Sequence, residues 1–312
     1  MIDFFYKLYV NIIDKNVFLR KIRFYSLLRW IIRNVANIIL PSYFNLTKNN
    51  VKYRLFSYNR KKQRLIVSLT SFPARIERLW LVIETLLRQS KKPDMIILWL
   101  SKEQFGNIDI LPPQLIKQQS RGLTIRLVDG DIRSHKKYLF ALNEYPNDIL
   151  VTADDDIFYQ TNWLQSMFEN HQLYPNAVIC LYGFHIKYDE NFVLAKYNEW
   201  KFARKYEENV FFGSGGGVLF PSGCFYKDVT NIDLALQLCP LADDIWLNTM
   251  VRLNGNKIIK ISSVNVFLPV LNKNKTTLYS VNLLDGHNDI QLKQVISYYQ
   301  KKLNVDPYKF MN

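Results

Sequence analysis

The chain has 312 residues, of which 48% are hydrophobic and 14% aromatic. This length and composition allow a large buried core and argue against a disordered chain. Cys180, Cys224 and Cys239 show no C-x-x-C spacing, which argues against a disulfide framework and a zinc knuckle and favours a reducing compartment.

The net charge of +14 is concentrated near the N-terminus. Residues 1–64 hold 14 of the 41 Lys and Arg residues but only two acidic residues, so the rest of the chain is nearly balanced. We therefore predict a basic amphipathic helical arm and linker over residues 1–62. A folded domain is predicted over residues 63–312.

Apolar and aromatic residues alternate with basic residues along the arm. Because no stretch of about 18 residues is free of charge, a membrane-spanning helix is not expected. Arg29 and Arg33 interrupt the most apolar run and no small-residue cleavage site follows, so a secretory signal does not fit. The favoured interpretation is a helix lying on an anionic membrane surface. Packing on the domain or on a partner is the main alternative, and nucleic-acid binding is not expected.

The domain opens with alternating strand and helix patterns. The predicted strands are 64–72, 95–100, 123–129 and 148–156, and the predicted helices are 73–90 and 134–145. Ser134 is the expected N-cap of the second helix. This order is typical of an α/β fold with a mostly parallel central sheet flanked by helices. A helix at 161–175, a strand at 176–184 and a helix within 240–255 are predicted next.

The fourth predicted strand ends in Asp154, Asp155 and Asp156. Ligands of such sheets bind beyond the carboxyl ends of the strands, which is where this cluster lies. Adjacent carboxylates repel one another, and hard divalent cations such as Mg²⁺ or Mn²⁺ prefer carboxylate oxygens. Asp154 and Asp156 leave an extended strand on the same side, as in a D-x-D site that holds a metal and a diphosphate, whereas Asp155 faces the other way. A solvated turn or a helix N-cap is the alternative.

Three further features occur later in the chain. Asp243 and Asp244 stand at a helix start, where the macrodipole favours an ionised general base, although simple N-capping is the alternative. The glycine-rich stretch 213–217 is not followed by the Lys-Ser/Thr of a phosphate-binding loop, but glycines let the backbone approach a ligand. His287 is a lone histidine that a metal centre could use.

Together, these motifs resemble the GT-A class of nucleotide-sugar glycosyltransferases, in particular bacterial family-2-like enzymes that build surface polysaccharides. The resemblance covers residues 65–294. It rests on Ala153–Asp156 as the D-x-D motif, 213–217 as the glycine loop, Ala242–Asp244 as the acidic motif and His287 as the C-terminal histidine.

The resemblance implies a Rossmann-like GT-A fold, in which residues 63–156 bind the nucleotide and residues 157–312 bind the acceptor. It implies that Asp154, Asp156 and His287 hold the metal, and that Asp244 is the catalytic base with Asp243 supporting it. The donor would contact Thr70, Ser71, Arg75, Lys136, Lys137, Asp154, Asp155, Gly215, Gly216 and Gly217. For Lys136 and Lys137, a solvated helix face is the alternative.

The implied activity is a metal-dependent, inverting transfer of a hexose from a nucleoside-diphosphate sugar to a hydroxyl of a lipid-linked or cell-surface glycan, such as capsule, O-antigen or lipopolysaccharide. UDP is the favoured nucleotide, although Ser101 stands where many such enzymes carry an Asp that reads uracil. The implied location is cytoplasmic, at the inner face of the cell membrane. The alternatives are a sugar-phosphate nucleotidyltransferase or other metal-dependent phosphoryl-transfer enzyme, and a non-enzymatic membrane-binding adaptor.

Overall fold

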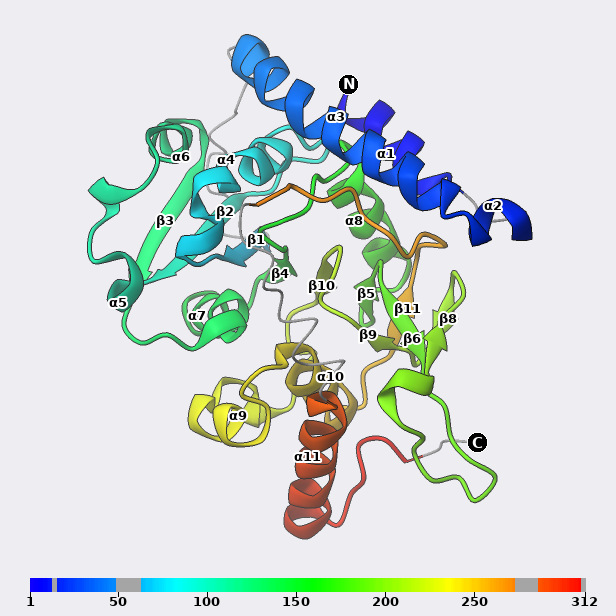
Figure 1. Ribbon diagram of the computed structural model, residues 1–312. Coiled ribbons are helices and arrows are strands. Elements are labelled where there is room, and N and C mark those ends of the chain that lie inside the picture. The colour runs from blue at the N-terminus through cyan, green and yellow to red at the C-terminus, as the bar shows by residue number, and fades with distance from the viewer. Residues whose placement is uncertain (13–15, 49–62, 273–285, 310–312) are drawn as a thin grey trace.

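The computed structural model describes residues 1–12, 16–48, 63–272 and 286–309 (Figure 1). Its centre is an eight-stranded sheet with the strand order β3-β2-β1-β4-β10-β5-β11-β8. These strands are β1 Leu65–Thr70, β2 Met95–Ser101, β3 Leu123–Val128, β4 Ile149–Thr152, β5 Val178–Cys180, β8 Glu207–Glu208, β10 Val218–Phe220 and β11 Ile258–Lys260. Strands β1 to β4 are parallel to one another, whereas β10 runs antiparallel to β4 and β5.

The sheet is buried on both faces, and the alternation of side chains along β1 shows how its core is divided. Leu65, Val67 and Leu69 pack with helices on one face, and Ile66 packs into the cluster on the other. A continuous aliphatic run suits such a doubly covered strand. The predicted α/β class with a mostly parallel, Rossmann-like sheet flanked by helices is therefore confirmed.

Helices cover the two faces of the sheet. The longer ones in the domain are α4 Pro73–Leu87, α7 Lys136–Glu144, α8 Trp163–Leu173, α10 Asp243–Leu253 and α11 His287–Leu303, with the shorter α5 Lys102–Phe105, α6 Pro113–Lys117 and α9 Ile232–Leu238 between them. A small second sheet has the strand order β7-β6-β9, made by Lys201–Phe202, Gly183–His185 and Phe211–Phe212. Cys180, Cys224 and Cys239 are free and buried, as their spacing predicts.

Two details differ from the sequence-based expectation. Ser134 lies inside a 3₁₀ turn, Arg133–His135, and α7 begins after it with no side-chain cap, so the predicted N-cap is wrong. The strand predicted at 176–184 is two strands, β5 and β6, which belong to different sheets. In the small sheet, Phe184 of β6 pairs with Phe202 of β7, and their rings stack with centroids 5.3 Å apart.

The N-terminal arm forms three helices, α1 Ile2–Val10, α2 Val17–Lys21 and α3 Phe24–Thr47. α3 crosses the outside of α4 and α8 (Figure 1), and its residues Ala36, Leu40 and Phe44 are buried in the same core as β1. Asp3 of α1 accepts hydrogen bonds from the backbone and the hydroxyl of Thr161. The arm therefore packs on the domain, as one of the two main interpretations of its sequence predicts. The polar linker that the sequence predicts over residues 41–62 is wrong at its start, because residues 41–47 belong to α3, whereas residues 49–62 lie outside the described residues.

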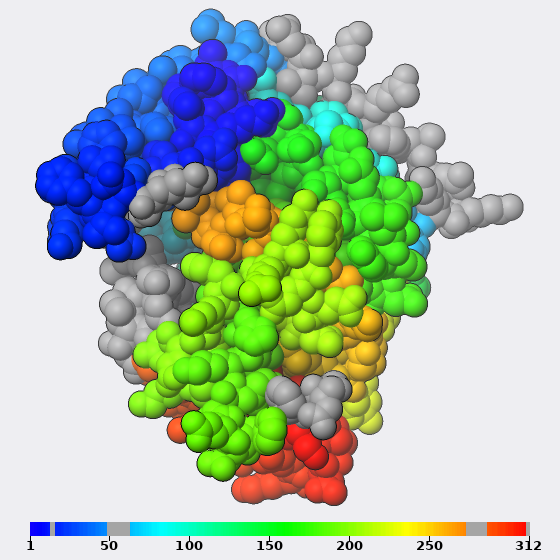
Figure 2. All heavy atoms as spheres, turned by 90° about the vertical axis from the view of Figure 1, so that its right-hand side faces the viewer, coloured from blue at the N-terminus to red at the C-terminus, as the bar shows by residue number. Residues whose placement is uncertain are grey.

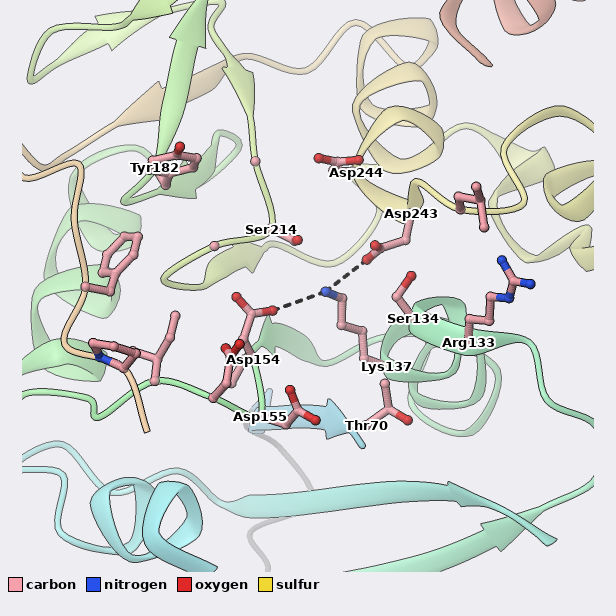
Figure 3. A pocket seen from close by; sticks show the side chains of 18 of the residues that line it. Thr70, Arg133, Ser134, Lys137, Asp154, Asp155, Tyr182, Ser214, Asp243 and Asp244 are labelled. Carbon is pink, nitrogen blue, oxygen red and sulfur yellow. Dashed lines mark hydrogen bonds and ion pairs between the residues drawn. The ribbon is translucent and has the colours of Figure 1, made fainter. Parts of the chain in front are cut away.

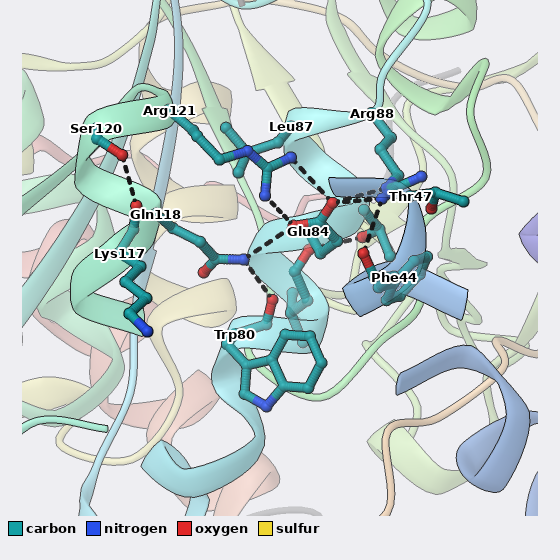
Figure 4. Close-up of polar contacts among 12 residues, drawn as sticks. Phe44, Thr47, Trp80, Glu84, Leu87, Arg88, Lys117, Gln118, Ser120 and Arg121 are labelled. Carbon is teal, nitrogen blue, oxygen red and sulfur yellow. Dashed lines mark hydrogen bonds and ion pairs between the residues drawn. The ribbon is translucent and has the colours of Figure 1, made fainter. Parts of the chain in front are cut away.

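A buried ionic cluster joins α3 and α4 to the 3₁₀ helix 118–121 (Figure 4). The Glu84 carboxylate, 2% exposed, pairs with Arg88 at 2.7 Å and with Arg121 at 2.6 Å. Arg88 also lies over the Phe44 ring, 4.9 Å from its centroid. Burial opposes ionisation of Glu84, but the two guanidinium groups lower its pKa below the ordinary value. The cluster therefore fixes the arm to the domain. No helix of the described residues, α3 included, is both long and apolar enough to cross a bilayer.

Replacing Phe44 by Ala should lower the free energy of unfolding by about 3–5 kcal/mol, because it opens a cavity between α3 and the domain. Denaturant titration measures this change. Phe18→Ala is the matched control, since Phe18 is 67% exposed and its truncation should cost less than about 0.5 kcal/mol. Equal effects of the two substitutions would contradict the packing of the arm.

Glu84→Gln should destabilise the protein by about 3 kcal/mol at neutral pH, because two guanidinium groups lose their buried counter-ion. A carboxyl whose folded pKa is lowered contributes stability above its unfolded pKa and loses it as the pH falls. The difference in unfolding free energy between wild type and variant should therefore shrink below about pH 4. A difference that does not depend on pH would contradict the assignment.

Candidate functional site

A cavity of about 990 Å³ opens at the carboxyl ends of β1 and β4. Side chains from distant parts of the domain line it, several of which Figure 3 labels. Tyr9 of the arm also lines it. Its charged and hydroxyl lining includes Thr70, Ser71, Arg75, Asp131, Arg133, Lys136, Lys137, Asp154, Asp155, Asp156, Ser214, Asp243 and Asp244. The aspartates of 154–156 and the pair at 243–244, which are about ninety residues apart in sequence, therefore line one cavity.

Lys137 links the two acidic groups (Figure 3). Its ammonium nitrogen lies 3.0 Å from a carboxylate oxygen of Asp243 and 3.5 Å from one of Asp154. Burial disfavours the charge, but Asp243 and Asp154 raise the pKa of Lys137 above its ordinary value, so this lysine is a cation. Of the two interpretations of this residue, the structure shows a buried lysine in the cavity rather than a solvated helix face.

Hydrogen bonds from two strands of the sheet hold the backbone of Lys137 in place. Ser68 of β1 donates a hydrogen bond from its hydroxyl to the backbone carbonyl of Lys137 at 2.5 Å, and the Trp99 indole donates to the same hydroxyl at 2.9 Å. These bonds hold the start of α7 against β1 and β2. The neighbouring Lys136 points to a different partner, Asp131, and pairs with it at the rim of the cavity.

Asp155 is bound by residues that follow β1. Its carboxylate accepts a hydrogen bond from the Ser71 hydroxyl at 2.6 Å and pairs with Arg75, which also lies 3.0 Å from Asp156. Thr70 donates its hydroxyl to the Trp99 carbonyl at 2.7 Å. Several side chains that the sequence assigns to the nucleotide are thus bound to one another or to backbone. They fix the ends of β1 and β4 relative to each other.

The centre of the cavity carries an excess of negative charge. Five carboxylates, those of residues 154–156 and of 243–244, face the two cations Arg75 and Lys137. Burial, together with Asp155 and Asp154, raises the pKa of Asp156 to about 7 although Arg75 opposes the shift, and burial also raises the pKa of Asp154. These oxygen donors fit a hard divalent cation, which would relieve the repulsion between them.

The two carboxylates at α10 have different pKa values. Burial opposes the charge on Asp243, but Lys137 lowers its pKa below the ordinary value, so it is ionised. Burial and the neighbouring charge of Asp243 raise the pKa of Asp244 to about 7. A pair of carboxyl groups with separated pKa values is the arrangement that assigns acid–base roles. Asp244 can therefore exchange a proton near neutral pH.

His287, the predicted C-terminal metal ligand, does not line the cavity in the structure. It begins α11 and is not among the described residues that line the cavity, whereas its neighbour Asn288 lines it and is 8% exposed. Within the described part of the chain, no group of three or more His, Cys, Asp or Glu residues is arranged to hold a metal. Among the described residues, the buried amide oxygen of Asn288 has no hydrogen-bond partner, a feature that the sequence pattern did not indicate.

The glycine stretch divides into two parts. Gly213, Ser214 and Gly215 line the cavity. Gly216 and Gly217 lie outside this lining, with φ angles of +80° and +103°. A Cβ at Gly216 would approach the Phe267 ring to 2.3 Å, and one at Gly217 would approach the Trp163 ring to 2.6 Å. These two glycines therefore serve the close packing of the loop rather than contact with a ligand.

The wall beyond the glycine loop is aromatic. The Tyr182 ring lies 5.8 Å from Phe267 and 5.2 Å from Phe184 between centroids. The wall consists of Tyr182, Phe184, Tyr197, Trp200, Phe202 and Phe267. Three of these residues belong to segment 187–209, where the apolar residues follow neither helical nor strand spacing. The role of this segment could therefore not be predicted from the sequence. The cavity thus has an acidic side and an aromatic side.

No protein-family model matches the chain, and no curated protein matches it. The solved structures that are similar to it include three that share 11–16% identity with it. One is 4-diphosphocytidyl-2C-methyl-D-erythritol synthase from Anaerococcus prevotii DSM 20548, with 16% identity, a TM-score of 0.41, and coverage of 66% of this chain and 92% of that one. A second structure of a synthase with that name has 12% identity, a TM-score of 0.41, and coverage of 72% and 99%.

The third similar structure is S. aureus TarS 1–349 in complex with UDP. It shares 11% identity with this chain at a TM-score of 0.43, and the alignment covers 78% of this chain and 72% of TarS. These likenesses assign neither an activity nor a ligand to this chain.

Proposed function

We propose that this protein is a metal-dependent glycosyltransferase that uses a nucleoside-diphosphate sugar. The observation that supports this proposal is the single cavity in which Asp154 and Asp156 lie across Lys137 from Asp243 and Asp244. One acidic group suits a donor diphosphate with its cation, and the other suits a hydroxyl acceptor. The cavity volume of about 990 Å³ is enough for two substrates side by side.

On the donor side, Asp154 and Asp156 would hold a Mn²⁺ or Mg²⁺ ion. When bound, such an ion supplies positive charge that stabilises a departing diphosphate. Arg75 and Lys137 hold these two carboxylates in place, each through an ion pair. We assign the nucleotide to the side of the cavity lined by Thr70 and Lys136, with UDP as the favoured donor nucleotide.

On the acceptor side, Asp244 would remove the proton of the attacking hydroxyl. Its pKa of about 7 makes it a base that works at neutral pH, while Asp243 stays ionised beside Lys137. A single displacement assisted by such a base inverts the anomeric carbon, so the proposal is an inverting hexosyltransferase. The aromatic wall at Tyr182 and Phe267 would receive the acceptor glycan, since flat rings pack against the apolar faces of sugars.

We place the acceptor on a lipid-linked or cell-surface glycan, because a basic arm would bring the cavity to the inner face of the cell membrane. A nucleotidyltransferase remains the competing activity. It uses basic groups after the first strand to bind a triphosphate, whereas Arg75 at this position is engaged by Asp155 and Asp156.

Asp244→Asn should reduce sugar transfer by at least about 100-fold, because the acceptor hydroxyl loses its base. Calorimetry should show that the variant still binds UDP in the presence of Mn²⁺. Asp233→Asn is the matched control, an exposed aspartate in the first turn of α9 that should keep full activity. Release of nucleoside diphosphate from sugar nucleotides supports transfer. Formation of pyrophosphate from a nucleoside triphosphate and a sugar phosphate would show nucleotidyl transfer instead.

The dependence of kcat/KM on pH tests the pair at α10. The rate should rise with pH up to about 7, because Asp244 must lose its proton to act. Asp243→Asn removes the neighbouring charge that raises the pKa of Asp244, so the acid limb of the residual activity should move to lower pH. If the acid limb of the variant's pH profile stays in place or moves to higher pH, Asp243 does not raise the pKa of an Asp244 base, and the proposed roles of the two residues are contradicted.

A further inference from the structure

The outward face of the arm is apolar. Large hydrophobic side chains are exposed along α2 and α3, among them Phe18, Ile22, Leu27, Trp30, Ile38 and Leu46. Ile38 is 73% exposed and Leu46 is 84% exposed. We call these six residues the outer face. Contiguous apolar surface of this kind marks an interaction site on a folded protein.

α3 differs from an ordinary surface helix because both of its sides carry apolar residues. Its inner side already buries Ala36, Leu40 and Phe44 in the core of the domain. The opposite side would be polar if water were its only neighbour, yet Leu27 and Ile38 lie there. Arg29 is instead half-buried and donates a hydrogen bond to the Ile12 carbonyl at 2.6 Å. The helix thus has one apolar side for the domain and a second for another partner.

The exposed charged residues of the arm are almost all basic. Lys7, Arg20, Lys21 and Arg23 are exposed on the same arm. In residues 1–12 and 16–48 the one acidic residue is Asp3, and it is turned inward to Thr161. A partner that complements this surface has apolar material for the outer face and negative charge for the basic side chains. An anionic lipid surface provides both.

A second copy of the chain fits less well. Two copies related by a two-fold axis would bring the same patch against itself, so the cations of α2 would face one another. Like charges at such an interface oppose association. A bilayer with anionic headgroups attracts these cations, so no such repulsion arises.

We propose that the outer face lies on an anionic membrane surface, with the α3 axis parallel to the membrane plane. In this position the apolar side chains would enter the boundary between headgroups and acyl chains, while the basic residues would contact the headgroups. This inference does not depend on the proposed enzymatic activity. Figure 2 shows the arm as a ridge on one side of the molecule, next to the segment around Pro269.

The position of the arm also relates the membrane to the cavity. Tyr9 of α1 lines the cavity, and so does Pro269, whose carbonyl accepts a hydrogen bond from Asn37 of α3 at 2.9 Å. The arm is therefore part of the rim. Docking through the outer face would hold the cavity at a fixed height above the lipid surface.

The test is a vesicle flotation assay with the full chain. Wild type should bind vesicles of phosphatidylcholine with phosphatidylglycerol at least about tenfold more strongly than vesicles of phosphatidylcholine alone. Leu27→Ser with Ile38→Ser should reduce binding to the anionic vesicles by at least about tenfold, because two inserted side chains are lost. Ile110→Ser with Val305→Ser is the matched control, since both residues are exposed apolar residues outside the arm, and it should leave binding unchanged.

A second variant isolates the charge. Arg20→Glu with Lys21→Glu should lower binding to anionic vesicles by at least about tenfold and leave binding to neutral vesicles unchanged, since each basic residue contributes about fivefold. Melting curves should confirm that all variants fold, as these side chains are exposed.

Three outcomes would overturn the proposal. The first is a folded wild-type protein that does not float with anionic vesicles. The second is unchanged binding of the Leu27 and Ile38 variant. The third is a dimer of the wild type in sedimentation that the same double substitution dissociates, which would show that the outer face covers a second copy.

Discussion

The ion pairs of Lys137 are the constraint on which the cavity depends. One buried ammonium group lies between Asp154, at the end of a strand, and Asp243, at the start of a helix. Without this cation the acidic groups would repel one another across the cavity, and the two halves of the domain would have no ionic link at this point. The same cation keeps Asp243 ionised, and the charge of Asp243 in turn raises the pKa of Asp244. One lysine thus sets both the shape of the cavity and its proton chemistry.

The sequence was informative for the central parallel strands, where a local pattern decides the structure. The aliphatic runs of β1, β2 and β4 predict buried parallel strands, and Asp154 at the end of β4 then has to lie at the ligand-binding edge. Contacts between residues that are far apart in the chain cannot be recognised from a local sequence pattern. The link from Lys137 to Asp243 spans over a hundred positions, and neither residue type nor spacing indicates it. The aromatic wall could not be predicted either, because its residues Trp200 and Phe202 belong to segment 187–209, in which apolar residues show no regular spacing.

Other differences have local physical causes. Gly216 and Gly217 look like residues that approach a ligand, but the space that a Cβ would need is filled by Phe267 and Trp163. The arm carries two apolar sides, and composition alone could not tell which side meets the domain. Leu40 and Phe44 settle that question by burial, and the exposed residues Leu27 and Ile38 define the remaining side.

Asn37 gives the arm a further significance. Besides its bond to the Pro269 carbonyl, its side chain accepts a hydrogen bond from the backbone of Leu271 at 2.9 Å. A shortened chain that starts after residue 62 would leave these backbone groups unpaired and would uncover the hydrophobic surface beneath Leu40. A defect in such a truncated protein would therefore report damage to the folded domain as much as loss of the surface that we propose to contact the membrane. Only substitutions on the solvent side can separate the two.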